Sequence, residues 1–238
     1  MKYYIADPHF FHGTVEDMDH RGFVSQLEMH EYMISQWNSR ITDEDEVYIV
    51  GDFSFGRGVE TWKVLSRLNG RIFMIEGNHD YWFLDDREFV DTFEEVAVYT
   101  EITDNGRTVI LCHYPMPFYN GQFRKDRDDN DSTFMVHGHI HNTYDEYLLF
   151  TMIRELAAEG RDTRETTMVN TPFHLLNVFC MYSDYVPLTL DEWQQKDSEI
   201  RKMIEDEEKR LDRRLTSEDW DKLNLEMVEK FTGRKPLG

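Results

Sequence analysis

Short apolar runs recur along the first 140 residues of the chain, and polar residues follow each run directly. The runs comprise residues 3–6, 47–50, 72–75, 109–112 and 134–136. Each is continuous and rich in β-branched or aromatic residues, which is typical of strands that are covered on both faces. Residues 175–179 have the same character. The pattern therefore predicts six buried strands.

Helical periodicity lies between some of these runs. Residues 27–37 and 59–68 have it, and Asn69-Gly70 predicts the end of the second helix. Residues 144–158 predict a third helix, closed by Glu159-Gly160, whereas the polar residues 161–167 predict a loop. Strands and helices mixed in this way indicate an α/β fold.

The last fifty residues are helical in pattern and heavily charged. Thr189 and Glu192 have the spacing of a capping box at a helix N-terminus. Thr216 to Asp219 predict the start of a last helix, and Gly233 predicts its end. The sequence therefore predicts two C-terminal helices.

Composition and charge exclude several classes of protein. The chain has 238 residues, of which 40% are hydrophobic, enough for one large domain with or without an appendage. It has 26 Lys and Arg against 47 Asp and Glu, a formal net charge of −21. Such an acidic surface repels nucleic acid and anionic membranes. Two cysteines form no disulfide framework, and no signal peptide or membrane span is evident, so we expect a soluble, cytoplasmic protein.

The polar residues after the strands are of three kinds, Asp, Asn and His. They are Asp7, His9, Asp52, Asn78, His113, His139 and His141. Asp and Asn terminate many strands as ordinary turn residues, but histidines after four of the strands need another explanation. Open α/β sheets place their ligand sites at strand ends, and carboxylate and imidazole groups suit divalent Mn, Fe, Zn and Ni. Seven such groups suffice for two ions.

The same residues resemble the five sequence blocks of the calcineurin-like metallophosphoesterases. In the order of the family, the blocks are Asp7-x-His9, Gly51-Asp52, Gly77-Asn78-His79-Asp80, His113 and Gly138-His139-x-His141. The similarity covers about residues 1–193, and its details resemble small bacterial or phage-type phosphoesterases. It implies a four-layer αββα sandwich with a helical insertion at about 144–170. Residues 194–238 would be a helical extension packed on the core.

The resemblance also implies roles for individual residues. One divalent ion would be held by Asp7, His9 and His141, the other by Asn78, His113 and His139, with Asp52 bridging the two. His79 would protonate the leaving group or stabilise the transition state, and Asp80 would orient it. The cofactors would be two divalent ions, Mn first and Fe, Ni or Zn as alternatives, and a bridging hydroxide would attack phosphorus.

Substrate binding is less specified by the sequence. His12 follows the first block closely, and Arg21 has the group that best matches a phosphate, so both are candidate substrate-binding residues. A surface histidine and a solvated arginine are the plainer alternatives. The insertion after His141 is a candidate lid beside the metals, with a simple surface helix as the alternative.

The expected function is metal-dependent hydrolysis of a phosphomonoester or phosphodiester. A small phosphorylated molecule or a nucleotide is the expected substrate, because the negative charge argues against long nucleic acid and against a membrane. One alternative is a nuclease. Another is a non-catalytic scaffold, although none of the expected ligands is substituted. The C-terminal helices could also mediate self-association.

Overall fold

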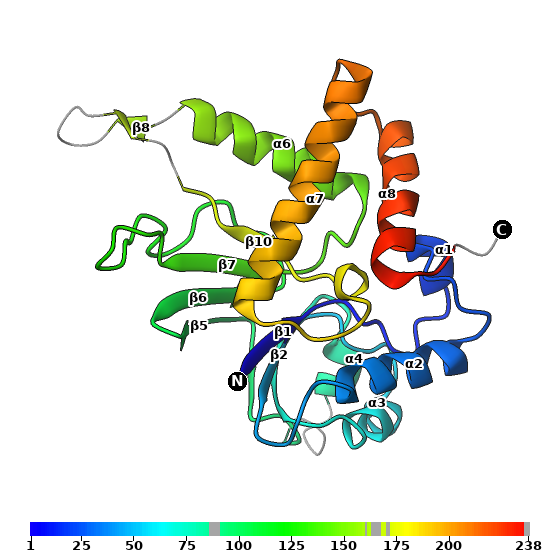
Figure 1. Ribbon diagram of the computed structural model, residues 1–238. Coiled ribbons are helices and arrows are strands. Elements are labelled where there is room, and N and C mark those ends of the chain that lie inside the picture. Colours follow the sequence, from blue (N-terminus) through cyan, green and yellow to red (C-terminus); the bar gives the residue numbers. More distant parts are fainter. Residues whose placement is uncertain (86–90, 160, 163–167, 170–171, 236–238) are drawn as a thin grey trace.

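Two four-stranded sheets form the centre of the computed structural model, which describes residues 1–85, 91–159, 161–162, 168–169 and 172–235 (Figure 1). The first sheet consists of parallel strands in the order β1 (Lys2–Ile5), β2 (Glu46–Val50), β3 (Arg71–Ile75) and β4 (Glu95–Ala97). The second has the order β10 (Leu175–Asn177), β7 (Thr133–His137), β6 (Arg107–Cys112) and β5 (Tyr99–Asp104). In the second sheet β5 is antiparallel to β6, and the other pairs are parallel.

The second sheet is buried on both faces. Val109 and Leu111 belong to the main hydrophobic core, which also contains the buried residues of the first sheet. Ile110 and Cys112 belong to a smaller core that includes Ile153 of helix α6 (Tyr144–Glu159). Because successive side chains of a strand point to opposite faces, this alternation places one sheet face against the first sheet and the other against α6.

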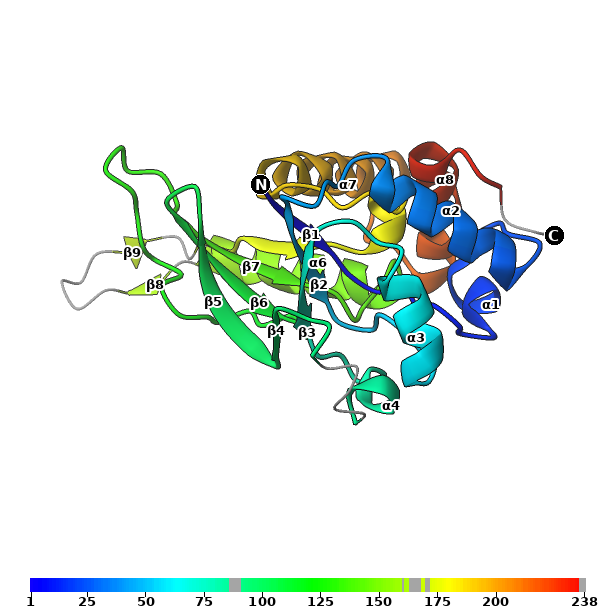
Figure 2. The same cartoon turned by 90° about the horizontal axis from the view of Figure 1, so that it is seen from below.

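The remaining helices cover the two sheets and their edges. They are α1 (Val15–Asp19), α2 (Gln26–Asn38), α3 (Gly58–Leu65), α4 (Tyr81–Leu84), α7 (Leu190–Leu211) and α8 (Ser217–Thr232), with a 3₁₀ turn, η1 (Cys180–Ser183). In Figure 1 the layers follow one another from α6 through the second and first sheets to α2 and α3. The short β8 (Arg161–Asp162) and β9 (Met168–Val169) project at the end opposite to α1 and α2 (Figures 1 and 2). The predicted αββα fold is confirmed.

The C-terminal helices share the main core with the sheets. The indole Nε1 of Trp193 donates to the carbonyl of Tyr4 at 2.8 Å, and that of Trp220 donates to the carbonyl of Asn142 at 2.9 Å. Both predicted helix starts are capping boxes, at Thr189 and Thr216, and Gly233 ends α8 with a φ of 66°. The division of the chain at residue 193 stays a prediction.

Several element boundaries differ from those expected. Helix α3 ends at Leu65, three residues early, and β10 ends at Asn177. Residues 161–162, predicted as loop, pair with β9, while residues 160 and 163–167 lie outside the described residues. Strands β4 and β5 were not predicted. No helix in the described part of the chain is long and apolar enough to cross a membrane.

Candidate metal centre

The predicted ligands converge at the carboxyl ends of five strands. Asp7 and His9 follow β1, Asp52 follows β2 and Asn78 follows β3, while the remaining ligands, His113, His139 and His141, lie at or beyond the ends of β6 and β7. Because the ligand-bearing strands run parallel within each sheet, their carboxyl ends meet at one edge of that sheet. The packing of the two sheets then brings the two edges together.

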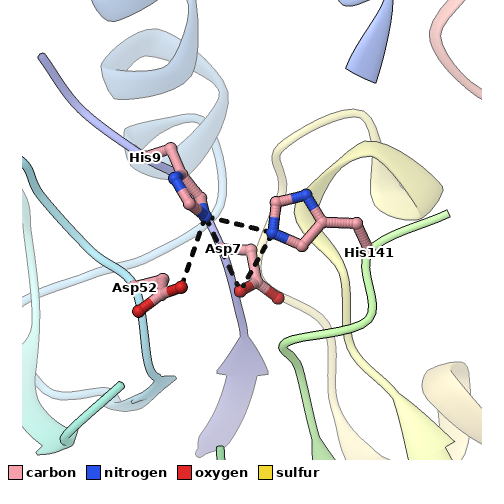
Figure 3. Close-up of side chains that lie close together, drawn as sticks. All are labelled: Asp7, His9, Asp52 and His141. Carbon is pink, nitrogen blue, oxygen red and sulfur yellow. Dashed lines mark hydrogen bonds and ion pairs between the residues drawn. The ribbon is translucent and has the colours of Figure 1, made fainter. Parts of the chain in front are cut away.

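Asp7, His9, Asp52 and His141 form the first cluster, shown in Figure 3. The Nε2 atoms of His9 and His141 are 3.1 Å apart, His9 Nε2 is 3.6 Å from Asp52 Oδ2, and His141 Nε2 is 3.5 Å from Asp7 Oδ1. Ligands about 2.1 Å from one ion at tetrahedral corners are separated by about 3.4 Å. The donor atoms therefore fit one divalent cation. The four residues are at most 5% exposed.

A second cluster contains Asp52, His113 and His139, whose ligand atoms lie within 4.8 Å of one another. His113 Nε2 is 3.4 Å from Asp52 Oδ2 and 3.1 Å from Asn78 Oδ1. The same oxygen of Asp52 thus faces His9 on one side and His113 on the other. This carboxylate lies between the two clusters, where a ligand shared by two ions would be.

The buried carboxylates of the site favour positive charge on the groups next to them. Burial lowers the pKa of His141, but Asp19 and Asp7 raise it more, to about 10. Burial also lowers the pKa of His113, which Asp52 and Asp7 raise to about 9. A divalent cation supplies the same positive charge and needs neutral imidazoles, so its binding would release these protons.

The ligand-bearing backbone has an unusual conformation. Five of the predicted ligands have a positive φ, namely Asp7 (57°), His9 (53°), Asp52 (50°), His139 (73°) and His141 (48°). This left-handed conformation costs a residue with a Cβ atom roughly 1–2 kcal/mol. Strain of this kind persists where surrounding contacts determine the conformation, and here it coincides with the candidate ligands.

Two glycines of the motifs permit the ligand carboxylates to approach the backbone. A Cβ atom at Gly77 would lie 2.3 Å from Asp52 Oδ1, and one at Gly138 would lie 2.4 Å from Asp7 Oδ2. Both distances are far below van der Waals contact. Any side chain at either position would therefore displace an Asp of the centre.

Comparison with known proteins agrees with this geometry. Residues 20–169, more than half of the chain, match the model of the calcineurin-like phosphoesterase superfamily domain. The chain belongs to this superfamily. The resemblance inferred from the five sequence blocks is thereby confirmed.

Relatives of this phosphoesterase-superfamily chain occur in an archaeon and a phage. The uncharacterized protein MJ1445 of Methanocaldococcus jannaschii is 32% identical in a match covering 61% of this chain and 72% of that protein. The gene 66 protein of Mycobacterium phage L5 is 27% identical in a match that covers 59% of this chain and 77% of that protein. A crystal structure of AQ665, a protein of unknown function from Aquifex aeolicus, superimposes with a TM-score of 0.53 at 20% identity, over 82% of this chain and 98% of that one. This last similarity shows the fold alone.

His79 and Asp80, the predicted catalytic pair of this superfamily member, have different environments. The half-buried ring of His79 lies 4.5 Å from that of Phe55 and 6.0 Å from that of His9, measured between ring centroids. Asp80 is fully buried, and its carboxylate accepts the backbone N–H groups of Asp52, Phe53 and Gly77 at 2.7–2.8 Å. Asp80 therefore fixes the ends of β2 and β3, which differs from the expected contact with the imidazole of His79.

The two predicted substrate-binding residues are also placed differently. His12 stacks on Phe55, with ring centroids 4.0 Å apart, and its ring is 5.2 Å from that of His9. It therefore adjoins the first cluster. Arg21 is completely buried, and its guanidinium donates to Asp19 and to backbone carbonyls. A substrate cannot reach it, so the expected phosphate clamp at Arg21 is a wrong prediction.

Asp19 is a site residue that the sequence interpretation missed. It is completely buried, and its Oδ1 lies 2.8 Å from Nδ1 of His141. It lies at the end of the five-residue helix α1, among other acidic residues, in a strongly acidic chain. Its sequence context therefore resembles that of a solvated side chain, and only the fold reveals its contact with a candidate ligand.

Proposed function

We propose that this chain hydrolyses a phosphoester with the help of two divalent ions. The observation that carries the proposal is the position of Asp52 Oδ2 between two ligand clusters, 3.6 Å from His9 Nε2 and 3.4 Å from His113 Nε2. When bound, such a pair of ions would supply an activated water and neutralise charge on the phosphoryl oxygens.

The residues of the chain would hold and orient this centre. Asp7, His9 and His141 would bind the first ion, and Asn78, His113 and His139 the second. His113 Nδ1 lies 3.0 Å from the carbonyl oxygen of Val50, which accepts its N–H, so Nε2 on the side of Asp52 is the ring atom left to bind an ion. Such outer contacts fix the tautomer of a ligating histidine and the direction of its ring.

His79 would act on the leaving group. It neighbours Asn78, its backbone N–H donates to Asp52 Oδ1 at 2.9 Å, and its half-buried ring has access to solvent. A protonated imidazole in this place can donate a proton to the departing alkoxide. His12, next to His9, would contact the same part of the substrate.

The substrate would approach from the side of the second ion. Asn78 and His139 are exposed, whereas the first cluster is covered by protein. The net charge of −21 favours a small phosphorylated molecule or nucleotide over long nucleic acid. Manganese is the first candidate metal, and Fe, Ni and Zn accept the same ligands.

The protein would work in the cytoplasm. Cys112 and Cys180 are both buried and free, which fits a reducing compartment. The absence of a spanning helix among the described residues is compatible with this proposal.

The decisive experiment measures hydrolysis of p-nitrophenyl phosphate and bis-p-nitrophenyl phosphate by metal-stripped protein reloaded with Mn, Fe, Ni or Zn. We expect turnover only in the reloaded protein. An oligonucleotide in the same panel tests the nuclease alternative, which faster cleavage of that substrate would favour. Full metal occupancy with no turnover on any ester would contradict the proposal and favour the scaffold alternative.

A further inference from the structure

We infer that Asp19 and Arg21 form a buried positioning unit for the first metal position, that of Asp7, His9 and His141. This inference rests on the proposed function, since it assigns those three residues to one ion. Both residues are completely buried, so neither would contact a substrate. Both act through contacts with the ligands and with the backbone that carries them.

Asp19 orients His141. Its Oδ1 lies 2.8 Å from Nδ1 of His141, and both side chains are buried. A carboxylate at this distance accepts the N–H of Nδ1, so Nε2, which points away from Asp19, is the ring atom left to bind an ion. That Nε2 faces Asp7 Oδ1 and His9 Nε2 (Figure 3). A carboxylate behind a histidine in this way also increases the basicity of the ligand.

Arg21 connects Asp19 to the segment that carries the other two ligands. Its Nε and Nη2 donate to Asp19 Oδ2 at 3.0 and 2.7 Å. The same guanidinium donates from Nη1 to the carbonyl of Pro8 at 2.6 Å and from Nη2 to the carbonyl of Asp7 at 3.0 Å. One planar group therefore holds both Asp19 and the strained Asp7-Pro8-His9 segment, which a lysine could not do.

The chain around this pair is itself fixed. The carboxylate of Glu16 accepts the backbone N–H groups of Gly22 and Phe23. Arg234, from the segment after α8, lies over the rings of Phe23 and Tyr32 at 4.1 and 3.9 Å. The pair is thus supported from both sides, by the turn after α1 and by the C-terminal segment.

The second position is supported in a different way. His113 uses the neutral backbone carbonyl of Val50 where His141 uses the carboxylate of Asp19. Among the described residues, the Asp19–Arg21 pair makes no hydrogen bond to a ligand of the second position. Loss of the pair should therefore weaken one ion selectively, and the first position should be the tighter of the two in the intact protein.

The test is a titration of the metal-stripped full chain with Mn²⁺ in competition with a chelator. In Asp19→Asn we expect one of the two affinities to fall about 10–100-fold and the other to stay within a factor of about two. The variant Asn78→Ala shows which position is affected. It weakens the second position alone, so in the double variant Asp19→Asn with Asn78→Ala the binding of the remaining ion should weaken as well. Asp104→Asn is the matched control, since Asp104 is a buried carboxylate that accepts from Tyr4 outside the centre.

Arg21→Lys serves as the second variant, because Asp19→Asn leaves the buried Arg21 without its counter-charge and could fail to fold. This variant keeps the positive charge but removes the planar set of guanidinium donors. The Mn²⁺ affinity of the first position should therefore fall, while the circular dichroism spectrum stays that of the native protein. Equal weakening of both ions, or unchanged affinities in a folded variant, would overturn the inference. A wild-type chain that binds Mn²⁺ but hydrolyses nothing would contradict only the proposed function.

Discussion

The two halves of the candidate centre are built differently. Asp7, His9 and His141 are 0–5% exposed, and a buried ion pair supports them. In the other half His113 is buried, but Asn78 and His139 are exposed, and a backbone carbonyl supports His113. Burial and charged support favour permanent retention of an ion, whereas an exposed position can exchange water and substrate. In the proposed two-ion centre, the buried half would therefore retain its ion, and the ion of the exposed half would be the one that the substrate reaches.

The largest expected effect comes from removing the residue that both halves share. Asp52→Asn should lower turnover by at least about 10³-fold, because one neutral amide cannot serve two ions. Metal analysis should find both ions reduced. Retention of two ions with wild-type turnover would show that Asp52 does not join the halves. Asp104→Asn is again the control for a buried Asp outside the site.

The next effect separates chemistry from metal binding. His79→Ala should lower turnover about 10²–10⁴-fold with both ions retained, because His79 would donate a proton and is not a predicted ligand. If the variant loses metal from the second half, His79 supports metal binding and the proposed separation of chemistry from metal binding is wrong.

The stability of the metal-free protein should depend on pH through one histidine in each half. In the metal-free protein the pKa of His141 is raised from 6.5 to about 10 and that of His113 to about 9. Because these pKa values are higher in the folded than in the unfolded state, protonation of the two histidines stabilises the folded state. This stabilisation is complete below pH 6.5 and is lost as the pH rises toward 9–10. We expect the Tm of the chelator-treated protein to fall over that interval and that of the Mn-loaded protein to stay nearly constant. Two equal, flat profiles would contradict this assignment of charge.

The smallest effect tests the support of the first half by the C-terminal helices. Trp220→Phe removes the hydrogen bond from the indole to the carbonyl of Asn142, the residue after His141. The free energy of unfolding in urea should fall by about 1–3 kcal/mol, since a buried acceptor loses its partner. Mn²⁺ affinity of the first half should fall less than in Asp19→Asn. A larger fall in the second half would contradict the proposed division.

Much of the fold could be predicted from the sequence because the ligand-bearing strands are buried on both faces. β2 and β6 are continuous apolar runs for this reason, and each is followed by a residue of the centre. β5 was missed because it is an edge strand in which exposed and half-buried residues alternate, with Thr, Glu and Asp among them. Its polar composition gave no apolar signal.

The candidate ligands could be named from sequence blocks, but their supporting contacts could not. Asp19 and Arg21 are a charged pair in a chain rich in charges, and nothing local distinguishes a buried pair from a solvated one. Arg21 was assigned to substrate for that reason. The backbone contacts of Asp80 could not be foreseen either, because its three N–H donors come from backbone brought near by the fold. Its predicted role beside His79 stays a prediction.

The left-handed backbone at five candidate ligands has a consequence for protein engineering. Glycine adopts this conformation without steric cost, so replacing Asp7, His9, Asp52, His139 or His141 by glycine removes a ligand and relieves strain in one change. In a chain without metal, the relief of about 1–2 kcal/mol of backbone strain is opposed by the loss of buried contacts, such as that of His141 with Asp19. A selection for heat resistance in manganese would protect these ligands more strongly than the same selection in a chelator, because only bound metal adds stability that depends on every ligand.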